Sequence, residues 1–276
     1  MIDRPSSWSL LLTQTKYQNK IFIRNPMAAF FTLFFPLMIF IVVSLVFGNE
    51  YIPYLGVTTA QYYAPSMAVF AAVSATYTNL AVTTAYQRDR GILKRVRGTP
   101  LPAAVYMGGK IISAILIASA AVVVMLAVGV AFYGVQIYAA TLASAIVTFA
   151  VGVATFAALG LLVAALVPTG EAATAVTNAT LLPLAFFSGV FVAPAENPPA
   201  WLAAVSSFFP LKHFVEPFVA AFSPLTIGNG WDWFSLAYMA LWGVVALVLA
   251  IRLFKWQPPA GGGGRKRRRG KTVAAA

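Results

Sequence analysis

The feature that most constrains this chain is a series of apolar segments, each close to the length needed to cross a lipid bilayer. A bilayer core about 30 Å thick requires about 20 residues of helix. The chain has 60% hydrophobic and only 9% charged residues, too few charges to cover a soluble globular surface. The sequence therefore predicts an all-α integral membrane protein with six transmembrane helices. The predicted spans cover residues 27–47, 61–86, 106–132, 138–167, 172–192 and 231–254.

The most basic segment within the apolar part of the chain lies between the second and third predicted spans, at residues 86–102. It contains five bases and one acid, and short loops rich in Lys and Arg remain on the cytoplasmic side. With this loop inside, four bases precede the first span, six lie between Arg88 and Lys110, and eight lie from Arg252 onward, so only Lys212 is outside. This distribution predicts that both termini are cytoplasmic.

The same basic segment has the pattern of a short amphipathic helix. Ile92, Leu93 and Val96 would form an apolar ridge flanked by cations. Gly91 marks the start, and Pro100 ends the helix because proline has no amide hydrogen to donate. Two interpretations remain open at this point. The segment is either an anchor that sets orientation and contacts lipid headgroups, or a helix that docks on a partner.

Part of this segment reads GILKRVRGTPL, which resembles the first cytoplasmic loop of permease subunits in ABC-2 type ABC exporters, especially the daunorubicin-resistance-like branch. A second similarity lies at residues 188–218, where a Gly-Val-Phe exit, prolines with a tryptophan, Phe-Pro-Leu and a histidine resemble the family's segment between its last two spans. One departure is Asp89 with its two preceding residues, where the family usually has Glu-Arg, so that glutamate's role is not transferred to Asp89.

The resemblance implies a dimer of permeases in the bacterial inner membrane, bound to two copies of an ABC ATPase. The second permease is identical or related, and ATP and Mg are expected in the ATPase. The segment from Arg88 to Thr99 would sit in a groove of that ATPase. The residues expected to make this coupling contact are Arg88, Arg90, Leu93, Lys94, Arg95, Val96, Arg97 and Thr99.

The chain itself carries no catalytic machinery that the sequence reveals. It has no cysteine, no Ser-His-Asp set and no phosphate-binding loop with the spacing G-x-x-x-x-G-K-[ST]. We therefore expect no enzymatic activity and no cofactor or metal bound by this chain. Its net charge of +12 does not indicate a nucleic-acid partner, because the bases lie in short blocks beside apolar spans.

These features favour the permease subunit of an ATP-driven exporter that moves an amphipathic drug, lipid or lipid-linked compound outward across the plasma membrane. Two other classes remain open. A secondary transporter or channel would need buried ionisable residues, and the predicted spans contain almost none. A membrane scaffold that transports nothing is also compatible with the sequence.

The second predicted span is unusually polar for a membrane helix. Its polar residues include Ser74, Thr76, Thr78, Asn79, Thr83 and Thr84. Such groups need partners once water is absent, so this helix should face other helices or a cavity. The candidates for the substrate path are Thr76, Asn79 and Thr83, together with Phe186 and Phe187 of the fifth span.

Outside the core of the bundle, the sequence predicts three parts. Residues 1–25 should form an amphipathic helix in the cytoplasmic interface, and residues 26–256 the six-span domain. Residues 257–276 contain a run of four glycines followed by six bases between Arg265 and Lys271, so we expect a disordered tail attracted to anionic lipids. The apolar side of the first helix should comprise Trp8, Leu11, Leu12 and Phe22.

Residues 193–230, between the fifth and sixth spans, are rich in proline. Their apolar stretches of about ten residues are too short to cross a bilayer, which predicts two short re-entrant helices dipping into the outer leaflet. Lys212 and Glu216 stand four residues apart and predict a local ion pair. His213 is expected to be hydrogen-bonded rather than a metal ligand. In the first span, Pro36 predicts a kink.

Overall fold

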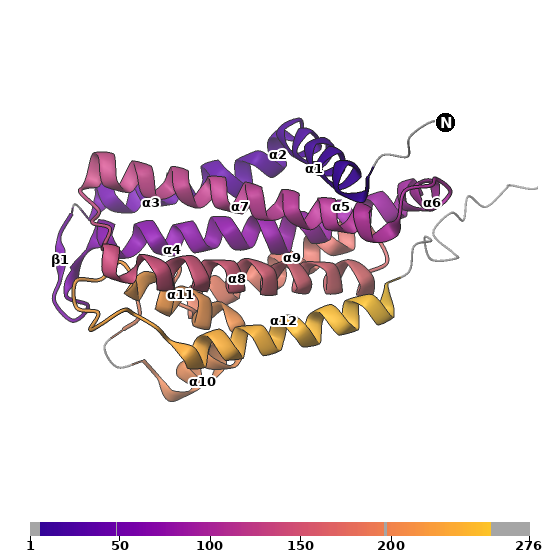
Figure 1. The fold of residues 1–276 in the computed structure, drawn as a ribbon. Helices are drawn as coiled ribbons and strands as arrows, with labels where there is room; N and C mark the ends of the chain where they lie inside the picture. Colours follow the sequence, from indigo (N-terminus) through magenta and orange to yellow (C-terminus); the bar gives the residue numbers. More distant parts are fainter. Residues whose placement is uncertain (1–5, 48, 196–197, 255–276) are drawn as a thin grey trace, which may run out of the picture.

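The structure, a computed structural model, describes residues 6–47, 49–195 and 198–254. Its helices lie side by side in an elongated bundle, with a two-stranded antiparallel ladder, β1 (Tyr51–Ile52) and β2 (Val57–Thr58), at one end (Figure 1). Two turns of π-helix, η1 and η2, interrupt the α-helices. The helical elements are α1 (Ser7–Ile23), α2 (Pro26–Ala29), η1 (Phe30–Phe34), α3 (Phe35–Val46), α4 (Thr59–Val73), η2 (Ser74–Thr78), α5 (Asn79–Asp89), α6 (Ile92–Arg97), α7 (Ala103–Tyr133), α8 (Ala139–Leu166), α9 (Gly170–Phe187), α10 (Ala200–Phe208), α11 (Pro210–Ala220) and α12 (Trp233–Leu253).

Five helices in the described part of the chain are long and apolar enough to cross a membrane, and they coincide with five of the six predicted spans. The chain is therefore a multi-pass, all-α membrane protein. The fifth predicted span corresponds to α9, which is not among the five. Its 18 residues rise about 27 Å at 1.5 Å per residue, and Glu171 and Asn178 lower its hydropathy. The five helices are Pro26–Val46, Thr59–Asp89, Ala103–Tyr133, Leu142–Leu166 and Trp233–Leu253.

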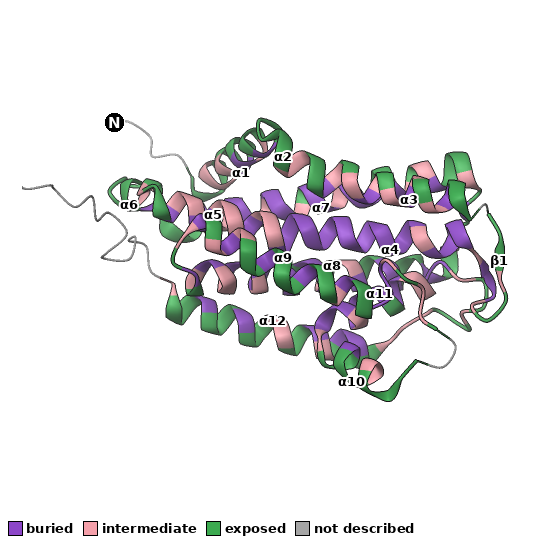
Figure 2. Cartoon of the chain, turned by 180° about the vertical axis from the view of Figure 1, so that it is seen from behind, coloured by how far each residue is buried: buried purple, intermediate pink, exposed green. Residues whose placement is uncertain are grey.

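The second span, which runs through α4, η2 and α5, is the centre of the bundle. In its most apolar window 78% of the residues are buried, compared with 22% in the first span, and Figure 2 shows α4 enclosed by the other helices. Several of its hydroxyls bond within the helix, for example from Ser66 to the Tyr62 carbonyl over 2.9 Å and from Thr76 to the Ala72 carbonyl over 2.8 Å. The prediction that this polar helix faces other helices is confirmed.

The first span changes its winding just before Pro36. The Phe35 amide bonds to the Phe30 carbonyl, which closes a wide π turn over η1. Because proline cannot donate an amide hydrogen, the regular α-helical ladder is interrupted at this position. The irregularity that Pro36 predicts therefore takes the form of a π turn between α2 and α3.

The fifth span ends earlier than predicted, at Phe187 rather than at residue 192. Gly189 follows with a φ of 79°, a left-handed conformation that ends the helix, and its carbonyl accepts a hydrogen bond from the Tyr62 hydroxyl over 2.6 Å. A Cβ at Gly189 would lie 2.8 Å from that hydroxyl oxygen. The contact of Gly189 with the second span therefore accompanies the end of α9. The apolar character of residues 190–192 gave no sign that the helix ends before them.

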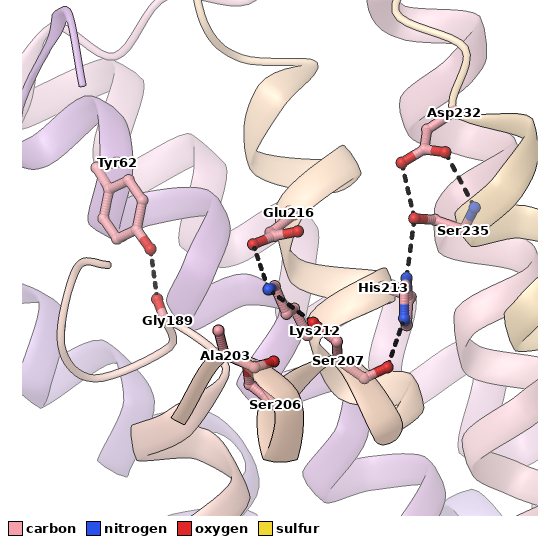
Figure 3. A network of polar contacts seen from close by, with 10 residues as sticks. All are labelled: Tyr62, Gly189, Ala203, Ser206, Ser207, Lys212, His213, Glu216, Asp232 and Ser235. Carbon is pink, nitrogen blue, oxygen red and sulfur yellow. Dashed lines mark hydrogen bonds and ion pairs between the residues drawn. The ribbon is translucent and has the colours of Figure 1, made fainter. Parts of the chain in front are cut away.

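The proline-rich segment forms two short helices, α10 and α11, as predicted. His213 on α11 is hydrogen-bonded through both ring nitrogens, at 3.1 Å from the Ser235 hydroxyl and 2.9 Å from the Ser207 carbonyl (Figure 3). The Lys212 ammonium lies 3.6 Å from the Glu216 carboxylate. Both local predictions for this segment are confirmed, and the histidine connects α10 and α11 to the start of α12.

α1 forms where the sequence predicts an interfacial helix, but it packs differently. It lies against α7, where a Cβ on Gly109 would approach the Gln14 side chain to 2.6 Å, so glycine permits the close contact. Of the predicted apolar face, Phe22 is buried against the bundle, whereas Trp8 and Leu12 are exposed. That the exposed part of this face lies among the acyl chains stays a prediction. The residues that α1 buries are Thr15, Gln18 and Phe22.

Candidate functional site

The basic segment forms the short helix α6, which projects from one end of the bundle (Figure 1). Gly91 precedes it with a φ of 70°, a conformation that glycine adopts without steric cost. Gly98 caps its end, and the Thr99 hydroxyl donates to the Val96 carbonyl over 2.6 Å. The predicted helix and both of its ends are confirmed.

The cations of this segment other than Arg88 are exposed at the surface of the bundle. In the part of the chain that the structure describes, none of them forms an ion pair, and Arg90 lies over the Tyr86 ring at 5.5 Å. Their charge is therefore available to an external partner. The exposed residues of the predicted coupling set are Arg90, Lys94, Arg95, Arg97 and Thr99.

The apolar ridge of α6 is divided between the interior and the surface. Leu93 has 0% of its surface exposed, whereas Ile92 is 38% exposed and Val96 is half-buried. The expectation that Leu93 faces a partner is corrected by this burial, because the side chain attaches α6 to the rest of this chain. The apolar surface left for docking consists of Ile92 and part of Val96.

Arg88 also lies inside the protein rather than on the coupling surface. It is 3% exposed, and its guanidinium donates to the Ala164 carbonyl over 2.6 Å and to the Val167 carbonyl. These carbonyls lie at the C-terminal end of α8, where the last carbonyl groups of a helix have no amide of the same helix to bond with. Nearby, a Cβ on Gly170 would lie 2.3 Å from the Tyr86 ring. The end of α5 is therefore joined to the α8–α9 turn.

A groove of about 500 Å³ lies between the first span, the η2–α5 part of the second span and α9. Its lining combines aromatic rings with uncharged polar groups, and none of its described residues is charged. A cavity of this size with a few polar groups is typical of small-molecule sites. The aromatic residues of the lining are Phe31, Phe35, Phe70 and Tyr86. The polar residues are Asn25, Thr32, Ser74, Thr78, Asn79, Thr83, Thr174 and Asn178.

Several polar groups of the groove have no partner within the described chain. This holds for the side-chain amides of Asn79 and Asn178, while the buried hydroxyl oxygen of Thr78 also lacks a hydrogen bond. Thr83, in contrast, donates to the Asn79 carbonyl over 2.7 Å. Free amides in an apolar environment favour a ligand that offers hydrogen-bonding groups.

The structure separates the predicted substrate-path residues. Asn79 and Thr83 line the groove together. Thr76 does not, because its backbone packs against α8, where a Cβ on Gly160 would lie 2.8 Å from the Thr76 carbonyl oxygen. Phe186 and Phe187 lie beyond the groove and are 54% and 37% exposed. Two of the five candidates therefore share one site.

Sequence reasoning missed the contribution of the first span and of α9 to this groove. Phe31 and Thr32 come from η1, and Thr174 and Asn178 come from α9. A signal was present for Asn178, since an amide inside a membrane span needs a partner or a cavity. The faces of Phe31 and Thr32 depend on the π turn at η1, which shifts the helical register and has no clear sequence pattern.

A second, water-sized hollow of about 20 Å³ lies on the other side of Asn79 and Thr83, between α1, α5 and α7. Lys110 reaches this hollow with 3% of its surface exposed, and its ammonium donates to the Gln87 side-chain oxygen over 2.6 Å. The described residues contain no group of three His, Asp or Glu side chains that could hold a metal ion.

Comparison with known proteins identifies the family to which this bundle of membrane helices belongs. A family model described as ABC-2 type transporter matches residues 9–223, from α1 through α11. Over 136 residues the chain is 27% identical to the probable multidrug ABC transporter permease YbhR of Escherichia coli strain K12 and to the protein of the same name in Escherichia coli O157:H7. That alignment covers 49% of this chain and 36% of each relative. Since the family match extends over more than half of its length, the chain belongs to the ABC-2 type transporter family.

Proposed function

We propose that this chain is the transmembrane permease subunit of an ATP-driven exporter in a bacterial inner membrane. It moves an amphipathic, drug-like or lipid-like substrate outward, and both of its termini are cytoplasmic. The ATP and Mg belong to two copies of a separate ATPase subunit, and the permease itself performs no catalysis. The similarity to relatives named as probable multidrug permeases supports this choice of substrate class.

The observation that carries the proposal is the groove between the first span, the second span and α9. Its rings can contact an apolar body, while the free amides of Asn79 and Asn178 can bind polar groups of the same molecule. The groove has the mixed lining that an amphipathic substrate requires. An ion channel would instead need charged or carbonyl-lined constrictions.

The position of α6 supports an ATPase partner. A row of unpaired cations beside a small apolar surface can guide a partner electrostatically and then bury Ile92 and Val96. Arg88 joins the end of α5 to the last carbonyls of α8. Movement of α6 would therefore be transmitted to α8 and α9, and so to the groove.

A second permease subunit is favoured by the apolar side chains on either side of the groove. On the first span Met27 and Phe31 are 65% and 52% exposed, and on α9 Leu182 is 41% exposed. A second copy packed on these two helices would cover the groove from the lipid. In our proposal, the substrate path lies between the two copies.

The test is reconstitution of the chain with the ABC ATPase encoded by a neighbouring gene. We expect ATP-dependent movement of a fluorescent amphiphile into inverted vesicles. Replacing both Asn79 and Asn178 by Leu should lower transport about 30-fold, because the two lost hydrogen bonds contribute about 1 kcal/mol each. An exposed residue of α8 outside the groove provides the control, Ile146→Leu. Amphiphile movement that does not depend on ATP would contradict the proposal.

A further inference from the structure

A second cavity, of about 330 Å³, lies at the end of the bundle opposite α6, between the β1–β2 ladder, the start of α4 and α11 (Figure 1). Its walls are mainly apolar. Leu225 covers the turn of the ladder so closely that a Cβ on Gly56 would lie 2.2 Å from its side chain. Gly56 has a φ of 64°, so glycine also suits the turn itself. The larger apolar side chains of the lining are Leu55, Val57, Val215, Val219, Phe222 and Leu225.

The uncharged polar groups of this lining already have partners inside the chain. The Gln61 amide donates to two backbone carbonyls over 2.9 and 2.6 Å. The Tyr62 hydroxyl donates to the Gly189 carbonyl over 2.6 Å (Figure 3). The hydroxyls of Ser223 and Thr226 also bond to the backbone. These bonds hold the wall in one arrangement and occupy most of its neutral polar groups.

Glu216 is the charged residue among those that the structure places around the cavity, and its carboxylate is poorly neutralised. The Lys212 ammonium lies 3.6 Å away, which is too far for a hydrogen bond, and it donates instead to the Ser207 hydroxyl over 3.0 Å (Figure 3). Among the described residues, the ion pair with Lys212 is the one polar contact that the structure gives the Glu216 carboxylate. Its side chain is 51% exposed, so a ligand can reach it.

Few other bases in the surrounding sequence could compensate this charge. The lining residues come from residues 55–62 and 194–226. Lys212 is the one Lys or Arg between residues 111 and 251, and none occurs between residues 25 and 87. His213 is also near, but both of its ring nitrogens are hydrogen-bonded to Ser235 and Ser207. An apolar cavity with one under-compensated carboxylate favours a ligand that combines positive charge with apolar surface.

We propose that this cavity binds a monovalent organic cation with an apolar body, with Glu216 as its counter-ion. The walls formed by the ladder and α11 enclose the apolar body, and the carboxylate contacts the charged group. Lys212 competes with the ligand for the same carboxylate. The binding itself is independent of the transport activity. Its place at the outer end of an export route rests on the proposed function.

The test measures binding by isothermal titration calorimetry with the full chain in neutral maltoside micelles. The probes are methyltriphenylphosphonium and its uncharged match, triphenylphosphine oxide. We expect the cation to bind about tenfold more tightly than the oxide, and Glu216→Gln to remove this difference, because the carboxylate supplies a charged contact. Lys212→Gln should strengthen cation binding, since it removes the competing ammonium. The control is Glu50→Gln, at an exposed acid outside the cavity lining.

The two variants of the pair separate ligand binding from a purely structural role. A structural ion pair would be weakened equally by either substitution, so loss of cation binding in Lys212→Gln would overturn the inference. Equal binding of both probes to the unmodified chain, or an unchanged cation preference in Glu216→Gln, would also overturn it. Retained oxide binding shows that the Glu216→Gln cavity is folded. If the Glu216→Gln variant binds neither probe, the Lys212→Gln variant gives the answer: stronger cation binding supports the inference, and weaker cation binding overturns it.

Vesicle transport with the ATPase distinguishes this inference from the proposed function. Glu216-dependent cation binding without ATP-dependent export would leave the inference standing and contradict the function. Export of the cation at an unchanged rate and concentration dependence in Glu216→Gln, together with unchanged binding, would contradict the inference and leave the function standing.

Discussion

At the scale of single residues, the buried bases show how a membrane bundle accommodates charge without carboxylate partners. Arg88 and Lys110 are each 3% exposed. Arg88 bonds to carbonyls at the end of α8, and Lys110 bonds to the side-chain oxygen of Gln87. A buried charge is tolerated only when it is hydrogen-bonded, so these neutral acceptors are as important to the packing as the bases themselves.

The pair formed by Gln87 and Lys110 yields a stability prediction. Gln87→Leu should destabilise the protein by about 1.5 to 3 kcal/mol, because it leaves a buried ammonium without its acceptor. Lys110→Met, which removes the charge and keeps the volume, should cost much less. The double variant should recover part of the loss in Gln87→Leu. Thermal unfolding in maltoside micelles measures all three, and a larger loss in Lys110→Met than in Gln87→Leu would show that the ammonium has another essential acceptor.

At the scale of elements, α6 combines an attachment and a docking surface within six residues. Leu93 points inward and Ile92 outward, although they are adjacent in sequence and similar in chemistry. Their different environments follow from the helix geometry once one residue is fixed, since neighbours on a helix point about 100° apart. The two residues should therefore have different effects when replaced by the same polar side chain.

We expect Leu93→Ser to lower the unfolding temperature, because a fully buried leucine contributes about 1.5 to 3 kcal/mol. The Ile92→Ser, Val96→Ser double variant should leave that temperature nearly unchanged and weaken ATPase co-purification about tenfold. Charge reversal at Arg95 should slow association and increase its dependence on salt. Full ATPase capture and full export by the double variant would assign α6 to orientation in the membrane rather than to coupling.

At the scale of the whole molecule, the two ends of the bundle differ in charge. The exposed bases Arg90, Lys94, Arg95 and Arg97 lie at the end that carries α6. The opposite end carries the β1–β2 ladder. This asymmetry is the pattern that orients a multi-pass protein during insertion.

The orientation can be measured with reporters fused at three points. A reporter after Arg97 should be cytoplasmic, and reporters after Gly134 and after Ala195 should be extracytoplasmic. The expected pattern follows from the position of α6 between the second and third spans and from the odd number of crossings before each outer site. Cytoplasmic activity at Ala195 together with extracytoplasmic activity at Gly134 would show that α9 does not cross.

Most of the architecture follows from patterns that are local in sequence. The apolar lengths specify the five spans, Gly91 and Pro100 specify the ends of the basic helix, and the prolines of residues 193–230 predict the two short helices α10 and α11. These features are local because bilayer thickness, proline geometry and glycine conformation act on a few consecutive residues. The predicted tail at residues 257–276 lies outside the described residues.

The site was only partly predictable for the same reason. Asn79 and Thr83 were identified because polar groups in a span require an explanation. Whether a polar group meets another helix, as near Thr76, or a cavity, as at Asn79, depends on which helix lies opposite. The inward side chains of Arg88 and Leu93 likewise have no signal in the basic segment. Spans, caps and charge asymmetry are thus set by interactions within a few residues. The groove, the attachment of α6 and the exposed carboxylate of Glu216 arise from contacts between segments that can be more than about 150 residues apart, which only packing of the whole bundle brings together.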